Sequence, residues 1–502
     1  MPSDLKTATL HATKWATAFT LTMQVGRAVV HFLLAFLLGP ETFGVAARVL
    51  AVGNILDMAS EFGFIASLIQ RKDLTPRHVS TAFVSNLALS LLMGILGFAG
   101  VRGFAAWSGG SEFLTIVQAV APLPVVLALG HVPQALLTRN LDFRTQTLAN
   151  LWGTFAYVLV SVGLAMIGFG AWSVLIGYYA NFAVLSLLLW RRSGWTPRFE
   201  FGREELRDLL GFGAYHAGSK FLNALTRGLD VLLIGWRLGN GAAGIYAVGL
   251  RVGALAVGQV TNVFNTVLFS SFSRLQQDRP RLGSAYLRST RILATLSAGL
   301  LAVAYAMVPA LPRVLGAAWD EAAPVARILC LYAYFLAAGG TLQPPALSAI
   351  GRSDWSLWLA IIRVGIQVAA LMVGMQFHLI AASVAMVVFQ VAANLVSQRY
   401  VTTGIGVTMK QYLRAVRESL AGLVAAIAVV HAIEALHDAD SLIALAARTA
   451  LAVLLAAAVF AGVVHAIERS VWPEIRSLVR GIANTASERK DHPMDQGPAG
   501  EA

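Results

Sequence analysis

Basic side chains occur inside stretches of this sequence that are otherwise apolar. They are Arg27, Arg48, Lys220, Arg227 and Arg251. A charged side chain at the centre of a bilayer costs roughly 3 kcal/mol or more unless protein and water surround it. Basic residues within apolar segments therefore predict a protein-lined aqueous cavity with positive charge.

The helix predicted over about residues 13–38 carries its polar side chains on one side. They are Thr13, Thr17, Thr20, Gln24, Arg27 and His31, at spacings of 4, 3, 4, 3 and 4 residues. This spacing places side chains on one face of an α-helix. Arg27 precedes Leu38 by about 16 Å of helical rise, which puts it near the midplane of a bilayer. That face cannot contact lipid, so we expect it to line the cavity.

A similar pattern returns 200 residues later. The turn LGPETFG at 38–44 corresponds to LGNGAAG at 238–244, and the same offset carries Arg27 onto Arg227. The second copy also has a polar stripe, formed by His216, Lys220, Asn223, Arg227 and Asp230. Because the turn, the arginine and the stripe all recur in register, we interpret the pattern as an internal duplication.

The helix that follows the first turn carries two carboxylates on one face. Asn54, Asp57 and Glu61 are spaced by 3 and 4 residues. Three interpretations stay open: the carboxylates neutralise Arg27 and Arg48 inside the bundle, they take a direct part in ion coupling, or they act at the mouth of the cavity.

The corresponding helix of the second copy has no carboxylate. It carries Arg251, Gln259, Asn262 and Asn265. The first half is therefore acidic and basic, whereas the second is mostly basic. Asp230 on the second stripe joins Asp57 and Glu61 as a candidate for coupling to an H⁺ or Na⁺ gradient, and no other cofactor is expected.

The histidines divide by position. His31 and His216 lie on the polar stripes and are candidates for proton sensing. His131, His431 and His465 are scattered and fit packed or interfacial positions better than a metal site.

A chain of 502 residues in which 57% are hydrophobic and 13% are charged is too apolar for a soluble enzyme of that size. We expect an all-α membrane protein with about fourteen transmembrane helices, six in each repeat and two more at the C-terminal end. An even number of helices sends both repeats into the membrane in the same direction, so the repeats are parallel. The expected limits are a polar lead-in at 1–12, a first lobe at 13–190, a cytoplasmic linker at 191–208, a second lobe at 209–400, two helices at 401–468, and a cytoplasmic, partly disordered tail at 469–502.

The distribution of basic residues predicts the orientation. Most lysines and arginines fall in segments on the side of the N-terminus, whereas the opposite loops receive Arg102 and Arg313 only. By the positive-inside rule, both termini are cytoplasmic. The net charge of +12 is accounted for in this way, so no nucleic-acid partner is expected.

Several signatures of catalysis are missing from the sequence. It contains no GxxxxGK[ST] loop, no HExxH and no zinc-spaced cluster of His and Cys, and its one cysteine is Cys330. The acidic pair Asp438 and Asp440 fits a turn with a helix cap. We therefore expect no catalytic residue, no metal site and no enzymatic activity.

Several stretches taken together resemble one known family. They are LGPETFG at 38–44, SEFGFIASLIQRKDLTPRHVSTAF at 60–83, VPQALLTRNLDFR at 132–144, LGNGAAGIYAVGLR at 238–251 and GAAWDEAAPVARIL at 316–329. They look like the polysaccharide transporters of the multidrug/oligosaccharidyl-lipid/polysaccharide exporter superfamily. Within it, they resemble the Wzx-type oligosaccharide flippases and the colanic-acid exporter branch, over about residues 10–400.

The resemblance implies two six-helix lobes that form a V-shaped cavity and work by alternating access. It implies a flippase of the bacterial inner membrane that moves an undecaprenyl-pyrophosphate-linked oligosaccharide to the periplasmic leaflet. The expected partners are this lipid-linked cargo, membrane lipids and other polysaccharide-assembly proteins. The basic residues named above suit the diphosphate, and Arg27 and Arg227, at matching depth on opposite lobes, are the expected pair that binds it.

The polar faces of the helices supply the expected lining of the cavity, and two alternative functions stay open. The lining is expected to include Gln24, His31, Asn54, His216, Asn223 and Asn262. One alternative is a flippase for the peptidoglycan lipid precursor, and the other is a membrane-embedded polysaccharide polymerase or ligase. The products distinguish them, because a flippase relocates its substrate unchanged whereas a polymerase lengthens it.

Overall fold

The computed structural model describes residues 3–61, 63–71, 73–108, 115–116, 118–436, 441–467 and 473, which form helices joined by short turns and contain no strand. The long helices are α1 (Ser3–Glu61), α3 (Pro76–Ser108), α5 (Leu123–Arg139), α6 (Phe143–Met166), α7 (Ala171–Ser193), α8 (Arg203–Leu238), α9 (Asn240–Arg274), α10 (Arg279–Met307), α12 (Ala322–Phe335), α14 (Ser353–Gly374), α15 (Leu379–Ile405), α16 (Met409–Leu436) and α17 (Leu442–Ile467). The short ones are α2 (Phe64–Gln70), α11 (Ala310–Leu315), the 3₁₀ turn η1 (Ala317–Trp319), the π-turn η2 (Leu336–Gly340) and α13 (Gln343–Ala349).

Within these described residues, 11 stretches are long and apolar enough to cross a membrane. They confirm the predicted all-α membrane class. The expected number of fourteen stays a prediction. The 11 include a single stretch, Ala28–Glu61, on both sides of the kink in α1, and they do not include α5 or the charge-rich α8. The helix α1 also starts at Ser3, within the lead-in expected at 1–12.

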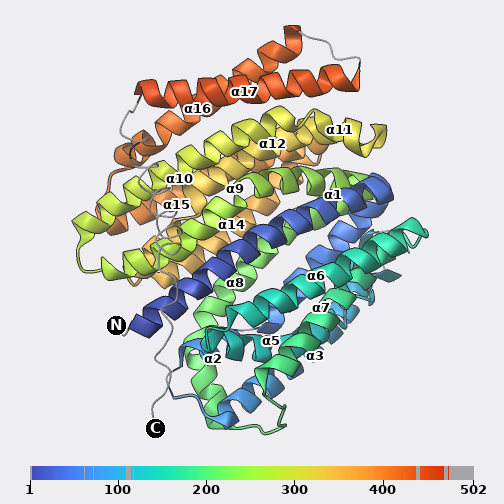
Figure 1. The fold of residues 1–502 in the computed structure, drawn as a ribbon, viewed down its shortest axis with the longest axis vertical. Coiled ribbons are helices and arrows are strands. Elements are labelled where there is room, and N and C mark those ends of the chain that lie inside the picture. The colour runs from blue at the N-terminus through green and yellow to red at the C-terminus, as the bar shows by residue number, and fades with distance from the viewer. Residues whose placement is uncertain are drawn as a thin grey trace, which may run out of the picture.

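Figure 1 shows two groups of helices at opposite ends of the long axis. The helices α2, α3, α5, α6 and α7 lie at one end and α10, α12, α16 and α17 at the other, with α1 and α8 between them. We call α1–α7 the first half and α8–α15 the second half. One cluster of buried apolar side chains joins the halves and includes Leu34 and Phe43 of α1, Ile234 of α8 and Tyr246 of α9.

The duplicated turn has the same backbone conformation in both copies. Gly39, where α1 kinks, has φ 68° and ψ 170°, and Gly239, between α8 and α9, has φ 94° and ψ 170°. Positive φ angles of this kind favour glycine, because it has no Cβ. The predicted duplication is therefore present in the backbone as well as in the sequence.

A second pair of turns repeats at an offset of 210 residues. At the end of α5, the N–H of Asp142 donates to the carbonyl oxygen of Leu137 at 2.9 Å. After α13, the N–H of Arg352 donates to the carbonyl oxygen of Leu347, also at 2.9 Å. The residue before each donor has positive φ, as in a Schellman motif, although only one of these residues is a glycine.

The two copies of the glycine turn touch backbone to backbone. A Cβ atom added to Gly44 would overlap the carbonyl oxygen of Asn240 and lie 2.9 Å from the amide nitrogen of Gly244. A Cβ atom added to Gly244 would overlap the carbonyl oxygen of Pro40 and lie 3.0 Å from the amide nitrogen of Gly44. We call residues 40–44 and 240–244 the helix crossing.

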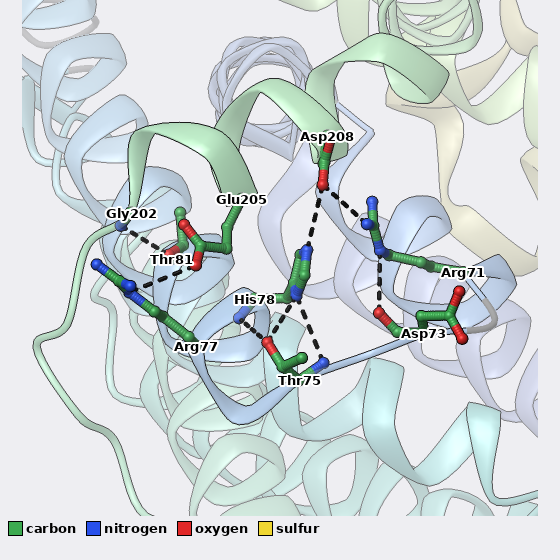
Figure 2. A network of polar contacts seen from close by, with 9 residues as sticks. All are labelled: Arg71, Asp73, Thr75, Arg77, His78, Thr81, Gly202, Glu205 and Asp208. Atoms are coloured by element: carbon green, nitrogen blue, oxygen red, sulfur yellow. Dashed lines mark hydrogen bonds and ion pairs between the residues drawn. The ribbon is translucent and has the colours of Figure 1, made fainter.

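The start of α8 is fastened to the first half by ion pairs (Figure 2). Asp208 accepts a hydrogen bond of 2.8 Å from Arg71 Nη2 and lies 3.6 Å from His78 Nε2. Glu205 lies 3.4 Å from Arg77 Nε. The arginines and the histidine belong to the loop after α2 and the first turn of α3, so these contacts connect the two halves.

Buried contacts extend this attachment. The hydroxyl of Ser67 donates to the carbonyl oxygen of Leu209 at 2.8 Å, and Leu209 packs in one cluster with Phe64 and Leu68 of α2. The N–H of Gly202 donates to Thr81 Oγ1 at 3.1 Å. We call residues 202–209 the docked segment, because they pack on the first half although α8 continues into the second.

One arginine of the motif at 132–144 supports the same region. Arg139 in the last turn of α5 donates to the carbonyl oxygens of Leu68, Ile69 and Arg71 at the end of α2. The last carbonyl groups of a helix have no partner within the helix, so the guanidinium supplies one.

The last two helices, α16 and α17, pack on the second half. Arg327 of α12 donates to Glu434 of α16. Arg291 Nε of α10 lies 3.9 Å from Glu418 Oε2 of α16. These ion pairs join α16 to α10 and α12 of the second half.

The glycines of the helix crossing give a first test. We expect Gly44→Ala and Gly244→Ala each to lower the free energy of unfolding by about 1–3 kcal/mol, because an added methyl group overlaps fixed backbone atoms. Gly163→Ala is the matched control, since a Cβ there meets nothing within 4 Å. Denaturant unfolding of the purified protein in detergent measures these differences. Equal stability of all three variants would contradict the proposed contact.

The docked segment gives a second test. Hydrogen bonding to Arg71 holds the pKa of the Asp208 carboxyl below its usual value. A lowered folded pKa means that the contact stabilises above the ordinary aspartate pKa of about 3.9 and is lost as the pH falls through the lowered value. We expect Asp208→Asn at neutral pH to speed amide hydrogen exchange at 203–209. Asp354→Asn, which removes another exposed ion pair, should leave that segment unchanged.

Candidate transport site

Arg48 is the predicted basic residue whose surroundings are best defined. It is 4% exposed, and its Nη1 donates to Asn240 Oδ1 at 2.6 Å. Its side chain also lies over Gly235 of α8, where an added Cβ atom would come within 3.0 Å of Arg48 Cζ. Arg48 therefore connects α1 to α8 and α9 next to the helix crossing. A role for it in cargo binding stays a prediction.

The predicted acidic face of α1 changes in exposure along its length. Asn54 is exposed, Asp57 is half-buried and Glu61 is buried. The face therefore turns from the surface of the bundle into its interior as the helix approaches its end. This arrangement leaves the three interpretations of the carboxylates open.

The structure brings together polar residues that the sequence analysis did not group. His131 Nε2 lies 3.6 Å from Asp57 Oδ1, and His131 Nδ1 lies 3.2 Å from Asn86 Oδ1. Asn86 Nδ2 in turn donates to the carbonyl oxygen of Ser60 at 2.9 Å. We call Asp57, Asn86 and His131 the polar triad. No spacing in the sequence could have found it, because its members come from α1, α3 and α5.

Asp230 lies in the interior of the second half. It is 3% exposed, and its Oδ2 accepts a hydrogen bond of 3.2 Å from the hydroxyl of Tyr246. Its Oδ1 accepts from the N–H of Val231 at 2.8 Å. One helical turn away, the carbonyl oxygen of Thr226 accepts from Gln367 Nε2 of α14. Asp230 therefore lies in a polar region shared by α8, α9 and α14.

The remaining predicted residues lie nearer the surface or outside the described side chains. Arg227 and Asn262 are exposed, Arg251 is half-buried, and the half-buried ring of His31 meets Phe43 edge to face. The side chains of Gln24, Arg27, His216, Lys220 and Asn223 lie outside the part of the chain whose side chains the structure describes. The structure therefore does not test the predicted pair Arg27 and Arg227, and the pair stays a prediction.

The sequence matches a known family over residues 33–324, which is more than half of the chain. That family is described as polysaccharide biosynthesis protein. This chain belongs to the polysaccharide biosynthesis protein family. The matched range begins in α1 and ends in α12, so it includes the helix crossing and the polar triad.

This member of the polysaccharide biosynthesis family has relatives in several bacteria. It is 28% identical to the succinoglycan biosynthesis transport protein ExoT of Rhizobium meliloti over 332 residues, which cover 66% of this chain and 67% of the relative. It is 23% identical to the lipopolysaccharide biosynthesis protein WzxC of Escherichia coli over 380 residues, covering 74% and 76% of the two chains. These relatives confirm the resemblance to polysaccharide transporters.

Solved structures of other transporters share the fold of this family member. The lipid II flippase MurJ in an inward closed conformation superposes with a TM-score of 0.69 at 13% identity, covering 89% of this chain and 98% of that one. An inward-facing multidrug resistance MATE family transporter of the MOP superfamily gives 0.64 at 17% identity, covering 76% and 94%. At such identities the likeness concerns the fold, and it agrees with the multi-pass, all-helical membrane fold described above.

Proposed function

We propose that this protein is a flippase that moves an undecaprenyl-pyrophosphate-linked oligosaccharide from the cytoplasmic to the periplasmic leaflet of the bacterial inner membrane. The observation that carries the proposal is the membership of the polysaccharide biosynthesis family. A relative named as a succinoglycan transport protein and a fold shared with a lipid II flippase support it. The cargo would serve the assembly of a surface polysaccharide.

The physical problem that such a protein solves is the polarity of the sugar. Moving one hydroxyl group from water into pure hydrocarbon costs roughly 4–8 kcal/mol, so several sugars cannot cross the membrane unaided. A water-filled, V-shaped cavity between the two halves would remove that cost. The lipid tail would stay in the hydrocarbon at a portal between the halves.

The charged part of the cargo is its diphosphate, and the basic residues of the chain suit it. Arg27 and Arg227 occupy equivalent positions in the two repeats, so each half would supply one guanidinium to the phosphates. Arg48, Lys220 and Arg251 would add positive charge around them. Gln24, His31, Asn54, His216, Asn223 and Asn262 would line the polar cavity. The exposed side chain of Arg227 meets one requirement of a residue that contacts a cargo.

The proposed mechanism is alternating access. The helix crossing would close one side of the cavity, and both termini would lie in the cytoplasm, with the docked segment on the same side. Rocking of the halves would open the crossing and close the opposite side. An H⁺ or Na⁺ gradient would drive the cycle through Asp57, Glu61 or Asp230. Membrane lipids and other polysaccharide-assembly proteins are the proposed partners.

The test compares the wild type with Arg27→Ala and Arg227→Ala in a strain deleted for this protein. We expect both variants to reach the membrane at normal abundance but to leave the lipid-linked oligosaccharide in the cytoplasmic leaflet. Surface polysaccharide and the leaflet position of the intermediate are measured together. Arg237→Ala, an exposed arginine at the end of α8, is the matched control and should export normally.

The outcomes separate the residues from the function. Normal export by both variants would contradict the proposed diphosphate site even if the protein is a flippase. A deletion strain that still relocates the intermediate would contradict the flippase itself. Lengthening of the glycan by the purified protein would favour the polymerase alternative. Arg48 is unsuited to this test, because its loss would also remove the contact with Asn240.

A further inference from the structure

We propose that His131 and Asp57 form a proton-binding site, in which one proton is held between His131 Nε2 and Asp57 Oδ1. The proposal deepens the proposed function, on which it rests, because it assigns H⁺ as the coupling ion and the first half as the place where it binds. The site consists of the polar triad, whose members project from α1, α3 and α5.

The hydrogen bonds of the triad fix the orientation of Asn86. Its Nδ2 lies 2.9 Å from the carbonyl oxygen of Ser60, which can only accept a hydrogen bond. The amide nitrogen must therefore be the atom on that side. The amide oxygen of Asn86 consequently faces His131 Nδ1, at 3.2 Å.

The orientation of Asn86 then fixes the tautomer of His131. An amide oxygen has no hydrogen to donate, so the hydrogen in this contact belongs to His131 Nδ1. A neutral imidazole that carries its hydrogen on Nδ1 has a bare lone pair on Nε2. That lone pair faces Asp57 Oδ1 at 3.6 Å.

Two acceptors therefore face each other in the absence of a further proton. Asp57 Oδ1 is buried and has no hydrogen-bond partner. A proton taken from water forms an Nε2–H bond on His131, and the resulting imidazolium donates to the carboxylate. Loss of that proton to water restores the starting pair. The gap of 3.6 Å would shorten on protonation, because charge-assisted hydrogen bonds are shorter than neutral ones.

The surroundings favour a response to the proton. The side chains of His131 and Asp57 are 12% and 15% exposed, so water compensates little of their charge. Glu61 lies one turn further along the same face of α1. Residues 82–94 of α3 contain no charged or titratable side chain, and residues 123–138 of α5 contain only His131. The helix α8, which packs along α1, contributes Arg227, and also His216 and Lys220, whose side chains lie outside the described part.

The chemistry of the triad suits a proton better than a metal ion. Hard cations take several oxygen ligands, and an imidazole nitrogen in the middle of the site is a poor substitute. Within the described residues, no group of three or more His, Cys, Asp or Glu side chains could hold a metal ion.

The site is placed to influence the contact between the halves. Asp57 belongs to the same arm of α1, after Gly39, as Gly44 and Arg48, which contact α8 and α9. The bound proton joins this arm to α3 and α5, whereas its loss sets two acceptors against each other. Protonation therefore changes the relative stability of two positions of α1, which is the requirement for coupling.

The test uses infrared difference spectra of the full-length protein, recorded between acidic and neutral pH in the absence of Na⁺. We expect a wild-type signal from the protonation of an imidazole next to a carboxylate. His131→Gln and Asp57→Asn should each lose the same component of that signal, and His431→Gln should keep it. His431→Gln is the matched control, because His431 also faces a carboxylate, Glu434 at 3.5 Å, but on α16. Retention of the full signal in both triad variants would overturn the proposal.

A second measurement does not depend on either substitution being tolerated. Spin labels on cysteines that replace the exposed residues Arg144 and Arg281, with the polar triad left intact, report the distance between the halves. We expect pH to change this distance without Na⁺. A distance that responds to Na⁺ at constant pH, and not to pH, would overturn the proton site. Export by the wild type in cells is scored in parallel, so normal export combined with a Na⁺ response would leave the flippase proposal intact.

Discussion

The contact between α1 and α9 depends on the absence of two side chains. Gly44 and Gly244 let the backbones of the two repeats approach until a methyl group on either would overlap a carbonyl oxygen. Gly39 and Gly239, with positive φ angles, direct the chain into this contact from both sides. Arg48 can reach Asn240 and cover Gly235 only because the helices are this close. The contacts of Arg48 with α8 and α9 follow from that approach.

At the other end of α8, the halves are held by different chemistry. The docked segment combines exposed ion pairs of Asp208 and Glu205 with the buried contacts of Ser67 and Leu209. Each ion pair has one largely exposed member, Asp208 or Arg77, and exposed ion pairs contribute little, so we attribute most of the attachment to the buried contacts. A carrier must open and close its ends in turn, and the helix crossing and the docked segment are two places where the halves are held together by different contacts. Asp57 of the polar triad lies on the arm of α1 between them.

The sequence predicted those features that are local or that repeat. The glycine turns at 38–44 and 238–244 have a fixed spacing and a conformational requirement, so both the duplication and the helix ends could be predicted. The contacts of Arg48 could not, because its partner Asn240 is 192 residues away. His131 was expected at a packed or interfacial position, since nothing along α5 indicates that Asp57 and Asn86 lie beside it. Hydropathy predicted the membrane class. The charge-rich α8, however, is not among the 11 stretches that are apolar enough to cross a membrane.

Alternating access through the helix crossing is the central claim, and a cross-link tests it most directly. Glu41 lies against Gly241, where an added Cβ atom would be 2.6 Å from Glu41 Oε1, so a cysteine at each position could be joined by a short thiol cross-linker. Cys330, the only native cysteine, is buried and adds little background. We predict that the cross-linked protein stops relocating the lipid-linked oligosaccharide and that cleavage of the linker restores the activity. Relocation at the wild-type rate while the crossing is joined would contradict the account.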